Sequence, residues 1–358
     1  MSRSSLPEPL QPSAAGSFLL EEIREQPDAL RRLLSHEAEF ADVAAAARER
    51  NLVRLVAHGS SDNAASYGVY AFGLLPGWTA LRDSISLTVY SGAKLDLSGS
   101  TVLALSQSGR TPDVVSYVEH ARAGGAFTVA VTNDPDSALG RAAEAILPLG
   151  AGPERSIAAT KTYLNTVAAL ALLAAHAAGR GHEFADGIAK VADQIDGVLP
   201  GLEAQVAELA VSFAFVGRIF VIGRGTELAT AREVALKLLE TCRVAAEPMT
   251  ATAFAHGPIA ALDALFPVWA IASKNQNVSV VREAVARARA ADAAVVATGD
   301  AARDVDASYR LETPEPSIPL LSPLLSVLPG QLFARALALA KGYDPDHPQR
   351  LEKVTLAR

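Results

Sequence analysis

The sequence predicts an α/β protein made of two similar halves, each a parallel β-sheet flanked by helices. Three observations support this fold class. Between residues 52 and 150, short β-branched runs alternate with helical segments, as in sheets covered by helices on both faces. The same order starts again at residue 218, which indicates a duplicated unit. In both halves, polar or glycine-rich turns follow the apolar strands.

Composition narrows the class of protein. The 358 residues suffice for two domains. The net charge of −7 and the absence of a basic block argue against a nucleic-acid partner. Cys242 is the only cysteine, so we expect a reducing cytoplasm and no zinc site built on cysteine. No run of about 18 apolar residues is uninterrupted, so no membrane span is expected.

The first half begins with a Ser/Pro-rich stretch, 1–17, predicted to be a disordered lead. Pro27 divides the next segment into two short helices. Apolar and β-branched runs then predict strands at 52–59, 84–90, 101–106, 127–133 and 145–150. Helical patterns lie between them at 62–75, 112–125 and 137–145, and a long helical stretch at 161–179 is followed by a helical connector to about 215.

The second half repeats strand, turn and helix from residue 218. Further strands are predicted at 266–273 and 293–300, and a last helix at 331–342. The proline-rich stretch 313–330 is expected to loop over the surface. The predicted organisation is therefore a lead at 1–17, domains at 18–190 and 191–340, and an irregular tail at 341–358.

The sequence SQSGRT follows the predicted strand at 101–106 and precedes a helix. In a parallel sheet, ligands bind at the carboxyl ends of strands, and a helix N-terminus there favours an anion. Gly109 lets the backbone approach closely, and Pro112 suits the first helical turn. The alternative is that the hydroxyls only cap the helix. We favour a phosphomonoester cradle made of Ser106, Gln107, Ser108 and Thr111, with Ser60 and Ser61 added by the HGSS sequence after the first strand.

One predicted helix carries three charged residues on one face. Glu233, Lys237 and Glu240 lie at i, i+4 and i+7. A carboxylate beside a lysine in a partly dry site can serve as a base. The alternative is a solvated ion pair on a surface helix, but the surrounding VALKLLET is strongly apolar and favours burial.

His256 lies between small residues and a Gly-Pro turn. A lone histidine is more often structural than catalytic. Imidazole is nevertheless the usual group for proton transfer near neutral pH, so this residue is a candidate for catalysis.

Five motifs, SQSGRT, AATKTY, ALKLLE, AHGP and DPDHPQRLEKVTL, together resemble the sugar isomerase (SIS) family. Their order is similar to the double-SIS isomerase half of glutamine–fructose-6-phosphate aminotransferases and to stand-alone glucosamine-6-phosphate deaminases. The resemblance runs from about Glu21 to the last residues. It implies two flavodoxin-like SIS domains and no cofactor or metal. The amidotransferase half of the aminotransferases has no counterpart in this sequence.

The resemblance also implies roles for individual residues. Glu240 matches the carboxylate that moves a proton between C1 and C2 of the sugar. His256 matches the histidine that opens the sugar ring from the neighbouring subunit, which implies a homodimer. Lys353 matches a tail lysine that forms an imine with a ketose. The SQSGRT residues match the phosphate loop, Ser60 and Ser61 close around the sugar, and Glu233 and Lys237 are further site residues.

Three positions depart from the family pattern. Ala159 stands where a serine is frequent, Glu352 where a small residue is usual, and Arg110 where an acidic residue is common. Arg110 could strengthen phosphate binding or point to solvent. These changes put the substrate in doubt more than the type of catalysis.

The implied chemistry is ring opening of a hexosamine 6-phosphate and proton abstraction at C2. With a free amine at C2, this leads to fructose 6-phosphate and ammonia, and the reverse direction makes glucosamine 6-phosphate. With an N-acetyl group, expulsion of the C3 hydroxyl makes the enzyme a dehydratase. A missing ammonia-delivering half favours deamination. A non-catalytic sugar-phosphate sensor is the remaining alternative, although no helix-turn-helix segment is evident.

Overall fold

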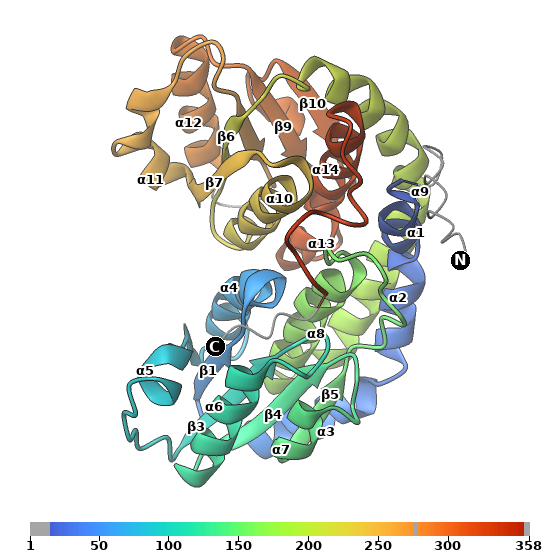
Figure 1. Ribbon diagram of the computed structural model, residues 1–358. Coiled ribbons are helices and arrows are strands. Elements are labelled where there is room, and N and C mark those ends of the chain that lie inside the picture. Colours follow the sequence, from blue (N-terminus) through green and yellow to red (C-terminus); the bar gives the residue numbers. More distant parts are fainter. Residues whose placement is uncertain (1–14, 275–277, 354–358) are drawn as a thin grey trace, which may run out of the picture.

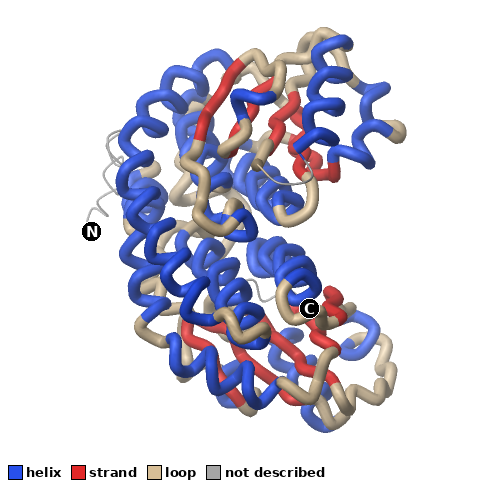
Figure 2. The backbone as a smooth tube through the Cα atoms, turned by 180° about the vertical axis from the view of Figure 1, so that it is seen from behind, coloured by secondary structure: helices blue, strands red, loops and turns tan. Residues whose placement is uncertain are grey.

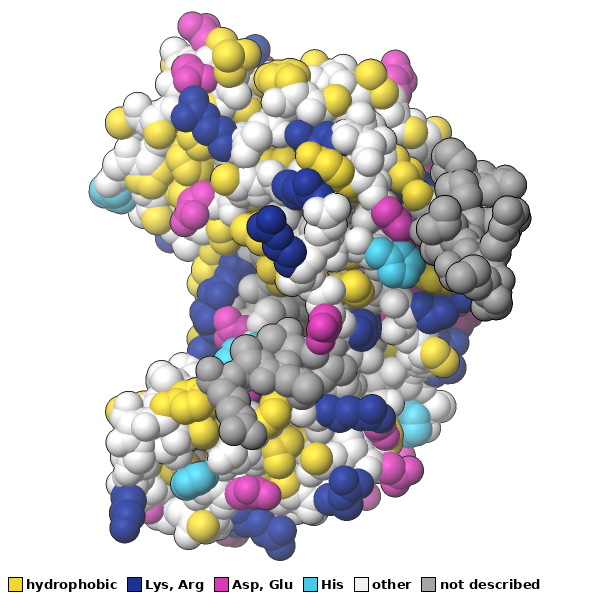
Figure 3. All heavy atoms as spheres, in the orientation of Figure 1, with side chains coloured by type: hydrophobic (Ala, Val, Ile, Leu, Met, Phe, Trp, Pro, Cys, Tyr) yellow, Lys and Arg dark blue, Asp and Glu magenta, His cyan; other side chains and the backbone are white. Residues whose placement is uncertain are grey.

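The chain forms two lobes, one above the other in Figure 1, each built on its own sheet. The computed structural model describes residues 15–274 and 278–353. Residues 1–14, most of the predicted lead, lie outside the described residues, as do residues 354–358 of the predicted tail. A notch separates the lobes on one side in the space-filling view (Figure 3).

Both sheets are parallel, as predicted. The first has the order β2-β1-β3-β4-β5 and the second the order β10-β9-β8-β6-β7. Read from β7, the second order repeats the first, so the predicted duplication is confirmed at the level of topology. The strands are β1 (Leu52–Val56), β2 (Thr79–Arg82), β3 (Ser100–Leu105), β4 (Phe127–Thr132), β5 (Ala145–Pro148), β6 (Arg218–Gly223), β7 (Ala245–Thr250), β8 (Val268–Ile271), β9 (Val295–Gly299) and β10 (Tyr309–Glu312).

Helices cover the sheets and form the outer wall behind them (Figure 2). The first half contains α1 (Ser17–Arg24), α2 (Gln26–Leu34), α3 (Glu37–Ala47), α4 (Gly59–Leu74), α5 (Ile85–Val89), α6 (Pro112–Ala123), α7 (Ala138–Ala142) and α8 (Lys161–Ala177). The long connector is α9 (Gly181–Ser212). The second half contains α10 (Glu227–Cys242), α11 (Ala251–Ala255), α12 (Val278–Ala290), α13 (Pro323–Ser326) and α14 (Leu328–Ala340), with short 3₁₀ turns at Pro258–Ala261, Ala302–Asp304 and Pro319–Leu321.

The lobes share one large apolar core. Residues from both sheets and from α8, α9, α10 and α14 belong to a single buried cluster. Helix α9 contacts α2 and α8 on one side and α14 on the other. The predicted domain boundary at residue 190 falls inside this helix. The lobes are therefore held together by continuous apolar packing as well as by the chain itself.

The strand predicted at 84–90 is wrong. Residues Ile85–Val89 form helix α5, with Ile85 and Thr88 buried at a spacing of three, which suits one helical face. The missing edge strand is β2, Thr79–Arg82. It is four residues long and only partly buried at the sheet edge, so it lacks the apolar run that marks interior strands.

The surface loop predicted at 313–330 is also wrong. Residues from Pro319 onward form a 3₁₀ turn, α13 and the start of α14, and each of these begins with a proline in its first turn. Proline is well tolerated there because that N–H needs no helical partner. The stretch Pro319–Ala340 is long and apolar enough to cross a membrane, but 78% of its 18-residue apolar window is buried inside the protein. It is therefore a core element of the second lobe.

Candidate active site

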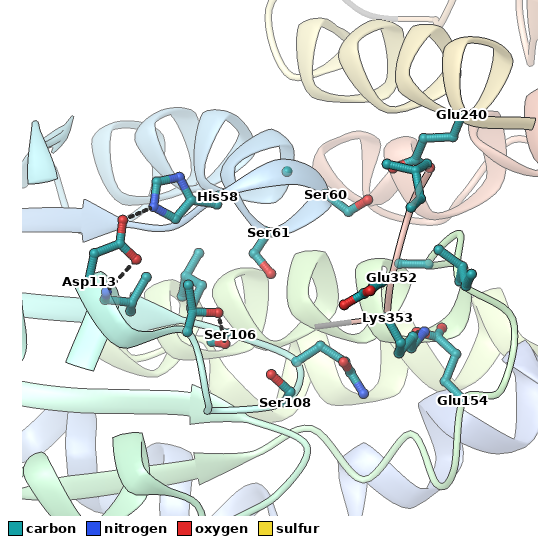
Figure 4. Close-up of a pocket in the computed structure, with 18 of the residues that line it drawn as sticks. His58, Ser60, Ser61, Ser106, Ser108, Asp113, Glu154, Glu240, Glu352 and Lys353 are labelled. Atoms are coloured by element: carbon teal, nitrogen blue, oxygen red, sulfur yellow. Dashed lines mark hydrogen bonds and ion pairs between the residues drawn. The ribbon is translucent and has the colours of Figure 1, made fainter. Parts of the chain in front are cut away.

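A cavity of about 460 Å³ lies between the lobes, at the carboxyl ends of β1 and β3. Figure 4 shows side chains pointing into it from the loops and helices that follow the strands of the first sheet, from α10 and from the C-terminal segment. Eight of the eleven predicted site residues line it, namely Ser60, Ser61, Ser106, Gln107, Ser108, Thr111, Glu240 and Lys353. The structure thus brings together residues up to about three hundred positions apart in sequence.

The phosphate-loop candidates form one end of this cavity. Ser106 Oγ accepts a hydrogen bond from the Gly109 N–H at 3.2 Å and lies 3.3 Å from Thr111 Oγ1. Thr111 is the N-cap residue of α6, and Pro112 is its first residue. The free N–H groups and the positive dipole end of α6 therefore face a hydroxyl-lined hollow. This arrangement suits a phosphate better than simple helix capping.

Gly109 is required by the shape of this loop. Its φ is +60°, and a Cβ atom added there would lie 1.9 Å from Ser137 Oγ and 2.5 Å from Ser137 Cβ. An L-residue would therefore be strained in its backbone and would also collide with a neighbour.

Helix α10 brings a buried charge network to the cavity from the second lobe. Lys237 Nζ lies 2.7 Å from Glu240 Oε2 and 3.3 Å from Glu233 Oε1. Ser60 Oγ and Asn63 Nδ2 each donate to the Glu233 carboxylate at 2.9 Å. The Glu233 and Lys237 side chains are 0% and 2% exposed, while Glu240 is 19% exposed and reaches the cavity. The exposed surface pair considered from sequence is therefore excluded.

The pKa values in this network follow from burial and charge. Burial raises the pKa of Glu233, although Lys237 and Asn63 oppose the shift. Burial alone would lower the pKa of Lys237, but the carboxylates of Glu233 and Glu240 outweigh it and raise that pKa. Lys237 is thus held as a cation beside the candidate base.

Close packing fixes the position of α10. Gly330 of α14 lies against Val234 of α10, and a Cβ at Gly330 would lie 2.3 Å from Val234 Cγ2. The absence of a side chain at this point lets the two helices approach closely. The face bearing Glu233, Lys237 and Glu240 is thereby turned towards α4.

Lys353 belongs to the C-terminal segment, which runs from the second lobe down to the first in Figure 1. Its Nζ donates to Glu154 Oε2 at 2.8 Å and to the Ser156 carbonyl at 2.6 Å. Burial acts to raise the pKa of Glu154, but Lys353 and the N–H and hydroxyl donors of Thr160 and Thr162 lower it overall. The lysine is therefore anchored at the wall of the cavity.

His256 lies outside the cavity of its own chain. It directly follows α11 and is exposed to solvent. Glu233 and Lys237 also do not line the cavity, but they contact Glu240 on the same helix, directly or in series, and so hold it in place. Among the predicted site residues, His256 is the one that lies apart from both the cavity and the charge network of α10.

The three departures from the family pattern fall in different places. Ala159 and Glu352 line the cavity. Arg110 does not: its side chain is 67% exposed and pairs with Asp134 at 3.3 Å. Of the two readings of Arg110, the structure supports the one in which it points away from the phosphate loop.

Sequence reasoning missed Glu154, Asn63 and Asp113. Glu154 and Asp113 line the cavity, and Asn63 holds Glu233. A signal existed for Glu154, since it is a lone carboxylate in a Gly/Pro turn after β5. Asp113 and Asn63 resemble ordinary residues of a first helical turn. Within the described ranges, no three His, Cys, Asp or Glu side chains group to hold a metal.

The corresponding edge of the second sheet holds a carboxylate of the protein itself. Ser273 follows β8 as Ser106 follows β3, and its Oγ donates to Glu227 at 2.6 Å. Thr230, Ser322 and Ser326 also donate to this fully buried carboxylate, at 2.7, 2.6 and 2.6 Å. The first half is predicted to bind an anion at this edge, whereas in the second half the hydroxyls of the described residues donate to Glu227.

Fold and site together define a member of the SIS family, and comparisons with known proteins agree. The SIS domain model matches residues 48–176 and 212–341, and the chain belongs to that family. It is homologous to the isomerase half of glutamine–fructose-6-phosphate aminotransferase. The enzyme of that name from Mycolicibacterium smegmatis is 34% identical over 94% of this chain and 57% of its own length. The chain thus spans little more than half of that relative.

Solved structures show the same architecture. A protein described as a phosphosugar isomerase from Silicibacter pomeroyi has a TM-score of 0.82 and 32% identity, over 92% of this chain and 99% of its own. Glucosamine-6-phosphate deaminase from Thermotoga maritima has a TM-score of 0.74 over 95% of this chain and 100% of its own. At 19% identity, that second likeness shows the fold alone.

Proposed function

We propose that this protein is an amino-sugar 6-phosphate enzyme, most directly a deaminase converting glucosamine 6-phosphate to fructose 6-phosphate and ammonia. One observation carries the proposal: a single cavity has the hydroxyl cradle of Ser106 and Thr111 at one end and Glu240 with Lys353 at the other. An opened hexose 6-phosphate has its phosphate and its reacting carbons at opposite ends. The cavity therefore suits one orientation of the substrate, with the phosphate at Ser106 and Thr111 and the reacting carbons at Glu240.

The reaction follows from the groups at the second end. Glu240 accepts the C2 proton, and the electron pair of that bond moves towards C1 and its oxygen. Return of a proton to C1 leaves an imine at C2. The amine of Lys353 can exchange with this imine, releasing ammonia, and water then releases the ketose. The same steps run backwards make glucosamine 6-phosphate when ammonia is supplied.

A second candidate is elimination from N-acetylglucosamine 6-phosphate. An N-acetyl group blocks imine formation, so the C2 carbanion would expel the C3 hydroxyl instead. Glu352 supports this alternative because it adds a carboxyl group to the cavity, and a leaving hydroxyl needs a proton donor.

The test is to incubate the protein separately with the two sugars. Ammonia and fructose 6-phosphate from glucosamine 6-phosphate support the deaminase. An ultraviolet-absorbing product from the N-acetyl sugar, without ammonia from the first, supports elimination. Turnover of neither sugar, with tight binding of one, favours the non-catalytic sensor.

We also propose a homodimer in which His256 enters the partner's cavity and opens the sugar ring. Exposure of His256 after α11 supports this. The one histidine among the described cavity residues, His58, lies on the opposite side of the cavity from Glu240 (Figure 4). Mixing Glu240→Gln with His256→Ala chains tests it. Each mixed dimer then has one intact site, so random pairing should restore about a quarter of wild-type activity. No recovery, or full activity of His256→Ala alone, would contradict the shared site.

A further inference from the structure

His58 and Asp113 form a pair at the phosphate end of the cavity. His58 Nε2 lies 2.7 Å from Asp113 Oδ2, and both residues line the cavity. His58 is the N-cap residue of α4, and Asp113 is the second residue of α6. The pair therefore joins the N-terminal ends of the two helices that face the cradle (Figure 4).

The charged side chains that line this cavity disfavour a phosphate unless a further cation is present. Glu240 is paired with the buried Lys237 at 2.7 Å. Within the described residues, the carboxylates of Asp113, Glu154, Glu240 and Glu352 line the cavity against one lysine, Lys353. That lysine is already paired with Glu154 at 2.8 Å. The side chains of the cradle itself are neutral donors. A phosphomonoester, which carries up to two negative charges, therefore meets a net negative surface.

Asp113 is the carboxylate that a phosphate would meet first. Its side chain is 11% exposed, and its Oδ1 accepts the Val114 N–H at 2.9 Å. It thus occupies part of the positive end of α6 that would otherwise serve the ligand. A cation on Asp113 would remove this competition.

We propose that His58 is a positioning residue for phosphate, which becomes protonated when the ester binds and neutralises Asp113 at the N-terminus of α6. This inference rests on the proposed function, because it assumes that a sugar phosphate occupies the cradle. It gives the site a protonation-linked affinity for phosphorylated sugars.

The other charged groups near the pair are already engaged or distant. Asp62 of α4 is paired with Arg82 at 2.5 Å and Arg232 at 3.0 Å. The Tyr90 hydroxyl lies 3.5 Å from Asp113 Oδ2. In Figure 4, Glu240, Glu352 and Lys353 lie at the opposite side of the cavity. The His58 side chain is 56% exposed, so protons reach it freely.

The experiment measures affinity by calorimetry at pH 6 and pH 8.5. Glucose 6-sulfate is the main probe because its ester does not titrate in this range, and fructose 6-phosphate is the second. Wild-type affinity for the sulfate should fall by about fivefold at the higher pH, since solvent screens the charge pair. His58→Gln can still donate to Asp113 but does not titrate, so it should lose most of this dependence.

Asp113→Asn is the matched variant. It keeps His58 but removes the charge that His58 neutralises, so its affinity at pH 8.5 should rise towards the wild-type value at pH 6. It also keeps the test decisive if His58→Gln folds poorly. An unchanged pH dependence in either folded variant overturns the assignment of His58. Wild-type protein that binds neither ester at either pH overturns the proposed function itself.

Discussion

Ser60 Oγ donates a hydrogen bond to Glu233 Oε1 at 2.9 Å and so joins the first turn of α4 to α10. These helices belong to different lobes, and Lys237 Nζ reaches the same hydroxyl at 3.2 Å. Together with the Asn63–Glu233 and Arg232–Asp62 contacts, this bond fixes the position of the helix that bears Glu240 relative to the first lobe.

Replacing Glu233 with Gln should weaken these contacts. Lys237 would keep only Glu240 as a charged partner in a buried position, so we expect a loss of about 3 kcal/mol of unfolding free energy. Misplacement of Glu240 should lower kcat by ten- to hundredfold, with roughly unchanged KM. Urea unfolding and steady-state kinetics measure both.

The control for this variant is Glu203→Gln. Glu203 pairs with Arg24 at 2.5 Å, at the surface and far from the cavity. Its loss should cost under about 1 kcal/mol and leave kcat unchanged. Equal effects of the two substitutions would contradict a special role for the α4–α10 contact.

Gly109→Ala should damage phosphate binding while sparing proton transfer. Its positive φ and the collision with Ser137 displace the loop that holds Ser106 and Thr111. We expect KM for glucosamine 6-phosphate to rise by at least about tenfold, with a smaller change in kcat. Gly92→Ala is the matched control, because Gly92 also has a positive φ of +68° but has no atom within 4 Å of an added Cβ. A similar KM for both variants would refute the account of the loop.

Lys353→Arg should separate anchoring from chemistry. Arginine can still pair with Glu154, so folding and binding should survive, with KM within about threefold of wild type. A guanidinium does not form the imine, so kcat should fall by about a hundredfold or more. Borohydride with fructose 6-phosphate should add a sugar to wild-type Lys353, seen by mass spectrometry. The same adduct on Lys353→Arg would place the imine on another residue.

Glu22 should make stability depend on pH. Burial raises the pKa of Glu22 to about 7, although the N–H groups of Arg155 and Ser156 favour its carboxylate. The folded state therefore holds this proton more tightly than the unfolded chain, whose ordinary value is 4.5. Its contribution to stability is complete below that lower value and is lost as the pH rises through about 7.

Glu22→Gln imitates the protonated form and should escape this loss. Between pH 5 and pH 8 the wild type should lose up to about 3 kcal/mol relative to the variant. Urea unfolding at several pH values measures the difference. Parallel stability curves for the two proteins would show that Glu22 does not titrate in this range.

How far the sequence predicts this molecule depends on how local each signal is. Strand β3 and the turn from Ser106 to Thr111 were predictable, because a buried run and its hydroxyl-rich end lie together in the chain. Strand β2 was not, since an edge strand of four residues has little apolar pattern. Prolines misled at 313–330, where they begin helices instead of ending them.

In the site, too, local features were predictable and contacts between distant residues were not. The spacing of Glu233, Lys237 and Glu240 and the apolar residues around them predicted a buried helical face, and Glu233 and Lys237 are indeed buried. The partner of Lys353 was hidden because Glu154 lies 199 residues away in the sequence. The use of the second sheet's carboxyl edge could not be predicted either. No residue near Ser273 in the sequence indicates that its hydroxyl donates to the buried Glu227.

The most direct test of the account is the fate of the C2 hydrogen of glucosamine 6-phosphate. Wild-type protein given the 2-deuterio sugar should release ammonia, show a primary isotope effect and yield fructose 6-phosphate with deuterium lost from C2 to C1 or to solvent. Glu240→Gln, folded and still binding the sugar, should do so at less than about a hundredth of the rate. A Glu240→Gln protein that turns over at the wild-type rate would contradict the central claim.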